Sequence, residues 1–199
     1  MIWEKNVKII IMACELTEGK SKKCYLYWPK LSTPLSSNDL NLNNGYKIKA
    51  LSEKNLTNNL TERTFIITNS NEKKEVKQLH FRKWPDHGVP DLIETFETFE
   101  NINEIIYQHY ETYKSECPVV VHCSAGVGRT GTVISIYQIF YIAKKYIEKN
   151  LNNFDLNIFN IARRLKEQRR YMIQTSIQYE MIYKFAYIFL KELSQSLKK

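Results

Sequence analysis

A cysteine and an arginine six residues apart enclose a run of small residues in the segment VVVHCSAGVGRTG. The residues between Cys123 and Arg129 are Ser124, Ala125, Gly126, Val127 and Gly128. Such residues let successive backbone N–H groups turn inward and form an anion nest. A helix predicted to begin near Arg129 directs its positive end toward the same loop. The spacing therefore predicts a cradle for a tetrahedral dianion.

The two end residues of this loop suit phosphate chemistry. Arg129 carries a planar guanidinium, which binds two phosphate oxygens at once. The positive field of the loop is expected to lower the pKa of the Cys123 thiol from about 8.5 toward about 3.5 to 7.5, so that it acts as a thiolate nucleophile. The alternative is a tight turn that packs a strand on a helix around a buried cysteine. A Walker-type phosphate loop is excluded because the GK[ST] ending is absent.

The flanking sequence predicts the elements that position the loop. Val119 to Val121 form a continuous apolar run, typical of a strand buried on both faces, and a helical pattern covers residues 129–148. Further strands are predicted at 7–13, 24–28, 46–51, 63–68 and 76–83, and further helices at 92–106, 155–168 and 176–193. Asp91 and Glu94 resemble a capping box for the first of these helices. The order predicts one α/β (α+β) domain over residues 1–199, with a central mixed β-sheet flanked by helices.

The composition restricts the class of protein. The chain has 43% hydrophobic and 25% charged residues, which is typical of one globular domain, and no apolar run long enough to span a membrane. No secretory signal is visible, so a cytoplasmic location is expected. The net charge of +8 favours anionic partners: nucleic acid, acidic membranes or phosphorylated peptides.

The cysteines and histidines do not predict a metal site. No CxxC pair or HExxH motif is present, so we expect neither a metal nor another cofactor. Cys14 lies in an apolar run and is predicted to be a small buried hydrophobic residue. His80 and His109 are expected on the surfaces of a strand and a helix.

The sequence resembles the catalytic domain of the cysteine-dependent protein tyrosine phosphatases. The family signature HC-x5-R-[ST] is matched by His122, Cys123, Arg129 and Thr130. WPDHGVP at 84–90 resembles the mobile loop that carries the general acid, and MIQTSIQY at 172–179 resembles the glutamine loop. The segments WE at 3–4, KCYLYWP at 23–29 and RTF at 63–65 are also similar to family segments. The family has a further segment before the MIWE-like stretch, so we expect an N-terminally incomplete domain.

The resemblance implies a catalytic role for five side chains. Cys123 would attack phosphorus while the loop amides and Arg129 bind the equatorial oxygens. Asp86 would protonate the leaving tyrosyl oxygen and then activate water, and Gln174 would position that water. Thr130 would donate a hydrogen bond to the thiolate. On residue type alone, Asp86 could instead belong to an ordinary turn, and Thr130 could satisfy a backbone group at the helix start.

Supporting roles are implied for further side chains. His122 would organise the loop, Gln178 would contribute to phosphate binding, and His87 would line the cleft beside the phenyl ring. Glu18 would brace Arg129, and Lys23 would lie near the acid loop. Arg169 matches a family arginine ahead of the glutamine loop, although surface ion pairing accounts for it nearly as well.

The implied function is hydrolysis of phosphotyrosine in proteins through a cysteinyl-phosphate, with phosphotyrosine proteins or peptides as partners. The alternative is a phosphotyrosine-binding module with little turnover, because the segment that orients the substrate in the family has no counterpart here. A third interpretation is that the positive charge marks a surface that binds nucleic acid or a membrane. No RNP, zinc-finger or recognition-helix signature supports it, so we expect no nucleic-acid partner and no membrane segment in this chain.

Overall fold

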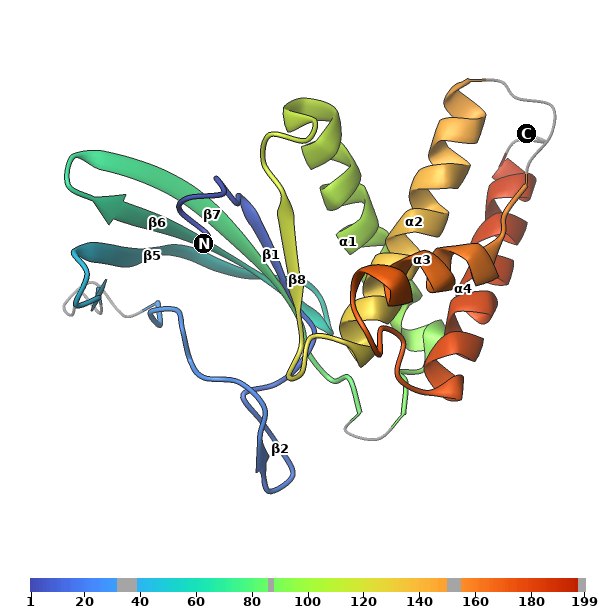
Figure 1. Ribbon diagram of the computed structural model, residues 1–199, viewed down its shortest axis with the longest axis horizontal. Coiled ribbons are helices and arrows are strands. Elements are labelled where there is room, and N and C mark those ends of the chain that lie inside the picture. The colour runs from blue at the N-terminus through green and yellow to red at the C-terminus, as the bar shows by residue number, and fades with distance from the viewer. Residues whose placement is uncertain (32–38, 86–87, 150–154, 197–199) are drawn as a thin grey trace. The chain divides into compact units, whose positions relative to one another are not determined.

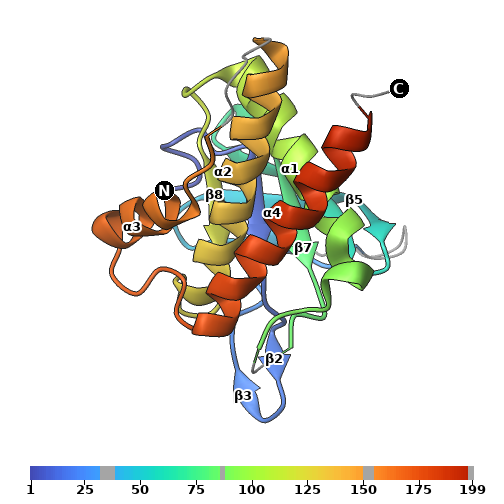
Figure 2. The same ribbon diagram turned by 90° about the vertical axis from the view of Figure 1, so that its right-hand side faces the viewer.

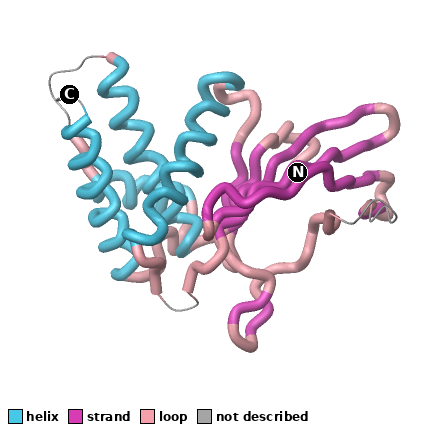
Figure 3. Tube along the Cα trace, turned by 180° about the vertical axis from the view of Figure 1, so that it is seen from behind, coloured by secondary structure: helices cyan, strands magenta, loops and turns pink. Residues whose placement is uncertain are grey.

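The chain folds into two compact units. A computed structural model describes residues 1–31, 39–85, 88–149 and 155–196. The first unit, here the sheet unit, consists of Met1–Trp84 and Gln108–Ser124; the second, the helical unit, consists of Pro85–Tyr107 and Ala125–Lys199. The strands all belong to the sheet unit (Figure 3). The single domain predicted for residues 1–199 stays a prediction.

The sheet unit contains the predicted mixed sheet. Its strand order is β4-β5-β6-β7-β1-β8, and the strands are β1 (Ile9–Met12), β4 (Leu40–Asn41), β5 (Tyr46–Thr57), β6 (Leu60–Asn69), β7 (Glu72–Phe81) and β8 (Val119–His122). The neighbouring pairs from β4 to β7 are antiparallel, whereas β1 is parallel to both β7 and β8 (Figure 1). Because β8 ends at His122, the sheet leads directly into the cysteine loop.

One predicted strand, at residues 24–28, is wrong. The structure instead forms a short hairpin from β2 (Thr17–Glu18) and β3 (Ser21–Lys22). Residues 24–28 join no ladder, and Tyr25 is 75% exposed. Trp28 is buried, and the Arg63 guanidinium carbon lies 5.0 Å from the centroid of the Trp28 ring. The aromatic composition resembled that of a strand, but Tyr27 and Trp28 contact the sheet through their side chains and not through a backbone ladder.

The predicted surface positions of His80 and His109 are also wrong. Both are buried, with exposed fractions of 3% and 6%. His80 Nε2 donates to the Cys14 carbonyl at 2.9 Å, and His109 Nε2 donates to the Cys117 carbonyl at 2.6 Å. Each ring reaches a backbone oxygen that would otherwise lack this donor, which explains why a histidine is tolerated there. Cys14 is buried, as predicted.

The burial of His80 predicts a loss of stability in acid. Burial lowers the pKa of His80 from 6.5 to about 4, so between these values the unfolded chain binds more protons and the free energy of unfolding falls as the pH is lowered. The full effect is at most about 3 kcal/mol. Urea unfolding at pH 7 and pH 4.5 measures it, with His80→Gln as the comparison. If the variant and the parent lose the same free energy between these two pH values, the prediction fails.

The helical unit is held together by aromatic contacts. Phe99 of α1 lies 5.9 Å from Phe185 of α4, and Phe140 of α2 lies 5.3 Å from Phe189 of α4, measured between ring centroids. These contacts place α1, α2 and α4 side by side, with α3 crossing beside them (Figure 2). The helices are α1 (Leu92–Tyr113), α2 (Gly128–Glu148), α3 (Ile158–Gln168) and α4 (Ser176–Ser196).

The predicted start of α1 is confirmed by its cap. Asp91 Oδ1 accepts hydrogen bonds from the backbone N–H of Ile93 at 2.7 Å and of Glu94 at 3.4 Å. An aspartate at this position satisfies donors that have no partner within the helix. α1 is longer than its sequence pattern predicted and ends at Tyr113. Within the described ranges, the helices are all too short or too polar to cross a membrane.

Candidate active site

The predicted nucleophile follows the last residue of β8. Cys123 is 8% exposed. The neighbouring His122 ring lies between two groups: its Nε2 is 2.8 Å from the Tyr27 hydroxyl, and its Nδ1 is 3.1 Å from the Cys123 carbonyl oxygen. Burial lowers the pKa of His122, and its contact with Cys123 opposes the shift. A ring that remains neutral and is fixed at both nitrogens suits the predicted role of organising the loop.

The loop at residues 123–129, here called the phosphate loop, contains one residue in the left-handed conformation that an anion nest uses. Gly126 has φ +70°, in the left-handed region that favours glycine. Val127 is the N-cap residue of α2 and has no side-chain oxygen with which to cap the helix. The Val127 carbonyl accepts from the N–H of Gly131 at 2.9 Å and from the N–H of Ile173 at 3.2 Å. The loop is therefore attached to the segment that precedes Gln174.

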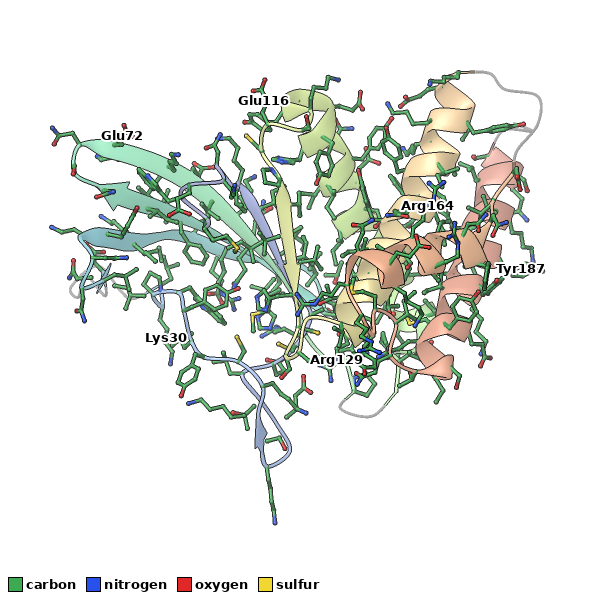
Figure 4. All side chains as sticks on the ribbon, in the orientation of Figure 1. Lys30, Glu72, Glu116, Arg129, Arg164 and Tyr187 are labelled. Carbon is green, nitrogen blue, oxygen red and sulfur yellow. The ribbon has the colours of Figure 1, made fainter. Side chains whose placement is uncertain are left out.

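Arg129 lies in the first turn of α2 (Figure 4). Its Nη2 donates to the carbonyl of Pro85 at 3.3 Å. Pro85 directly precedes Asp86, so this hydrogen bond joins the guanidinium to the start of the predicted acid loop. Asp86 and His87 themselves lie outside the described residues, and their roles stay predictions.

Gln178 fixes the glutamine loop against the phosphate loop. Its Oε1 accepts from the backbone N–H of Gln174 at 2.9 Å and of Thr175 at 3.3 Å. A methyl group at Gly128 would lie only 2.9 Å from Gln178 Nε2. The two loops predicted from separate motifs are thus in direct contact. The roles of Gln174 with water and of Gln178 with phosphate stay predictions.

Arg169 contacts the phosphate loop rather than a surface carboxylate. Its Nη2 donates to the Ala125 carbonyl at 3.2 Å. A Cβ atom added at Gly126 would lie 3.4 Å from the same nitrogen. Lys166, which the sequence did not single out, donates from Nζ to the carbonyl of Ile173 at 3.1 Å. The two basic side chains before the glutamine loop therefore support the backbone of both loops.

A pocket of about 620 Å³ lies beside the glutamine loop. Its lining comes from α3 and from the start of α4, and it includes Gln174 and Thr175. The same two residues therefore both contact Gln178 and line the pocket. Sequence motifs give no sign of this pocket, because it depends on the packing of α3.

The structure also describes three further residues for which the sequence predicts a role in the site. Glu18 is 8% exposed, and its Oε1 accepts from the backbone N–H of Glu15 at 3.1 Å. Lys23 donates its backbone N–H to the Leu16 carbonyl at 2.9 Å. Thr130 is 4% exposed, within the first turn of α2. Their roles toward Arg129, the acid loop and the thiolate stay predictions.

Replacing Gly131 by alanine is expected to separate the two loops. The new methyl carbon would lie 2.6 Å from the backbone nitrogen of Ile173, which cannot move without losing its bond to Val127. Helix propensity alone would stabilise the alanine variant by up to about 1 kcal/mol. We expect instead a destabilisation of about 1–3 kcal/mol, the usual effect of overpacking, measured by urea unfolding.

Gly128→Ala is the matched comparison for this prediction. Its methyl group would lie nearest to side-chain atoms of Gln178 and Gln174 rather than to backbone atoms. Side chains can shift at the cost of the hydrogen bonds of Gln178, so the loss should be smaller than that of Gly131→Ala. If Gly131→Ala is as stable as the parent, the close packing of these loops is contradicted.

The comparisons with known proteins give the family of the chain. Residues 1–187 match the family model described as protein-tyrosine phosphatase. Human tyrosine-protein phosphatase non-receptor type 12 is 35% identical over 97% of this chain, and mouse receptor-type tyrosine-protein phosphatase eta is 34% identical over 90%. The crystal structure of the catalytic domain of human protein tyrosine phosphatase non-receptor type 18 covers 93% of the chain with 28% identity and a TM-score of 0.73.

The chain spans only part of these proteins. It covers 23% of the type 12 protein, 13% of the eta receptor and 61% of the type 18 catalytic domain. A structure of PTPN18 in complex with HER2 phosphopeptides also matches, with a TM-score of 0.79 and 27% identity, over 95% of this chain and 65% of that one. The likeness confirms the predicted fold class of a mixed sheet with helices. The chain belongs to the protein-tyrosine phosphatase family.

Proposed function

We propose that this chain hydrolyses phosphotyrosine in proteins through a cysteinyl-phosphate. The observation that carries the proposal is the attachment of the phosphate loop to the glutamine loop, through the Val127 carbonyl and through the contact of Gly128 with Gln178. Two loops of a hydrolase that must act on one phosphoryl group need such a fixed relation. Family membership and the PTPN18 complex with phosphopeptides support the same substrate class.

In the first step, Cys123 attacks phosphorus, and a sulfur–phosphorus bond forms as the bond from phosphorus to the tyrosyl oxygen breaks. The amides of residues 124–129 and the Arg129 guanidinium bind the equatorial oxygens, where negative charge accumulates. Asp86 delivers its proton to the leaving oxygen. Thr130 donates to the sulfur, and Glu18 holds the Arg129 side chain in place.

In the second step, water attacks phosphorus and the sulfur–phosphorus bond breaks, which releases inorganic phosphate and regenerates the thiolate. Asp86, now a carboxylate, accepts a proton from that water, and Gln174 positions the water. Gln178 holds the loop that carries Gln174, while His87 and Lys23 border the cleft that admits the phenyl ring. Each step uses side chains of this chain, so we expect no requirement for a metal or another cofactor.

We also propose a cytoplasmic role in signalling. The four cysteines, all within the described residues, carry thiols, which suits a reducing compartment. The net charge of +8 suits a phosphorylated, acidic partner.

The release of nitrophenol from an aryl phosphate by the pure chain, in the presence of a chelator, tests the proposed function. We expect turnover that vanadate inhibits, together with preference for phosphotyrosine over phosphoserine peptides. Binding of a phosphotyrosine peptide without any release of phosphate would contradict hydrolysis and would indicate a binding module. Retention on polyanions that an aryl phosphate cannot displace would indicate a nucleic-acid or membrane surface.

A further inference from the structure

Polar side chains line one face of the sheet between the cysteine loop and the middle of the meander. Met12 of β1 is paired in register with His80 of β7 on one side and with His122 of β8 on the other. Arg63 of β6 is paired with Gln78 of β7. Because paired residues and residues two apart on a strand share a face, these five side chains lie on the same face of the sheet.

Arg63 determines the orientation of the Gln78 amide. Its Nη1 donates to Gln78 Oε1 at 2.9 Å, and its Nε donates to Glu53 Oε2 at 2.8 Å. A guanidinium has donors and no acceptor, so the amide atom that faces it must be the oxygen. The amide nitrogen of Gln78 therefore faces the other way, where its Nε2 donates to the Tyr27 hydroxyl at 2.8 Å.

The Tyr27 hydroxyl, which accepts from Gln78, is then the donor in its contact with His122. Its oxygen accepts from Gln78, and its single proton can go to His122 Nε2 at 2.8 Å or to Met12 Sδ at 3.8 Å. A thioether is a weak acceptor, so the shorter bond to the imidazole is favoured. The Nε2 atom of His122 is therefore an acceptor, and the proton of the neutral ring is on Nδ1.

The other side of the imidazole requires the same arrangement. Nδ1 lies 3.1 Å from the carbonyl oxygen of Cys123, which can only accept. Burial raises the pKa of Tyr27 and lowers that of His122, so the phenol keeps its proton and the imidazole stays neutral near pH 7. The hydrogen bonds that link Arg63, Gln78, Tyr27 and His122 thus all run in one direction, toward the carbonyl of Cys123.

We propose that Arg63, through Gln78 and Tyr27, fixes the tautomer of His122 and thereby orients the first peptide group of the phosphate loop. That peptide joins Cys123 to Ser124, and in a trans peptide the carbonyl and the N–H point in opposite directions. A carbonyl held by His122 directs the Ser124 N–H away from the histidine. Arg63, Gln78 and Tyr27 are positioning residues, and their effect on catalysis rests on the proposed function.

The first test needs no variant. Long-range proton–nitrogen correlation spectra of the labelled 199-residue chain near pH 7 report which imidazole nitrogen of His122 carries the proton. We expect a proton on Nδ1 and none on Nε2. A proton on Nε2 in the parent chain would overturn the proposal.

The second test reverses the hydrogen bond between Gln78 and Tyr27. In Gln78→Glu, the carboxylate still accepts from Arg63 but cannot donate to Tyr27, so Tyr27 donates to it and must accept from His122. We expect a proton on Nε2 in this variant and its absence in the double variant Gln78→Glu with Tyr27→Phe. An unprotonated Nε2 in Gln78→Glu, or a protonated one in the double variant, contradicts transmission through Tyr27.

The consequence for the loop is measured by vanadate inhibition. One misdirected amide should weaken inhibition of Gln78→Glu by about 3- to 10-fold relative to the parent. Unchanged inhibition, with the proton moved to Nε2, would overturn the orienting role. A parent chain that has the Nδ1 proton but hydrolyses no aryl phosphate would contradict the proposed function while supporting the proton arrangement.

Discussion

The Cys123→Ser variant is expected to hydrolyse neither aryl phosphates nor phosphotyrosine peptides. A serine hydroxyl is not ionised near neutral pH, so the attacking group is lost, and removing the nucleophile of a hydrolase lowers kcat on the order of 10⁶-fold. The loop amides and Arg129 remain, so a phosphotyrosine peptide should still bind. The release of phosphate and the affinity for the peptide are measured on the same preparation.

A second cysteine provides the control for this variant. Cys24 is half-buried, and its thiol donates to the carbonyl of the next residue, Tyr25, at 3.3 Å. Cys24→Ser keeps a donor of similar size and should retain the activity of the parent. Turnover by Cys123→Ser above the background would show that Cys123 is not the nucleophile.

Asp86→Ala is expected to lower turnover by about 10²–10⁴-fold, the usual contribution of a general acid. The tyrosyl oxygen would then leave without a proton, so the loss should be greatest for substrates whose leaving group is a strong base. Peptide affinity should change little, because the phosphate loop is intact. Single-turnover release of the leaving group, measured for substrates with poor and good leaving groups, reports this dependence.

Asp91→Ala is the matched control for the acid. Asp91 is the next aspartate in the chain, and its carboxylate is engaged in capping α1, so its loss should reduce stability by about 1 kcal/mol and leave the dependence on the leaving group unchanged. If Asp86→Ala releases a poor leaving group as fast as the parent does, another residue supplies the proton.

Local patterns were sufficient to predict the positions of the strand, loop and helix around Cys123. The predicted burial of the strand on both faces is wrong, because β8 is the last strand of the sheet and its residues are only partly buried. The apolar run before the loop, the small residues within it and the helical spacing after it all act over short distances along the chain, and β8 and α2 begin and end near their predicted limits. The capping of α1 by Asp91 is local in the same way. The match of His122, Cys123 and Arg129 to the family signature is likewise read from adjacent residues.

Features that depend on pairing between distant segments could not be predicted in this way. Whether His80 faces solvent or protein depends on what covers its side of the sheet, and Arg63 meets Gln78 only because of the β6–β7 register. The left-handed backbone of Ile173, with φ +58°, could not be predicted either, because β-branched residues rarely adopt this conformation. The aromatic run at 24–28 misled the prediction because its composition, and not its pairing, resembled a strand.

The shared acceptor at Val127 makes the opening of two loops a single event. One carbonyl oxygen receives the amides of Gly131 and Ile173, so fraying of the first turn of α2 also frees the residue next to Gln174. Ile173 then relaxes from its left-handed backbone, and this relief of strain favours the open form. We therefore expect the phosphate loop and the glutamine loop to open together, so that the amides of Gly131 and Ile173 show similar free energies of opening in hydrogen exchange.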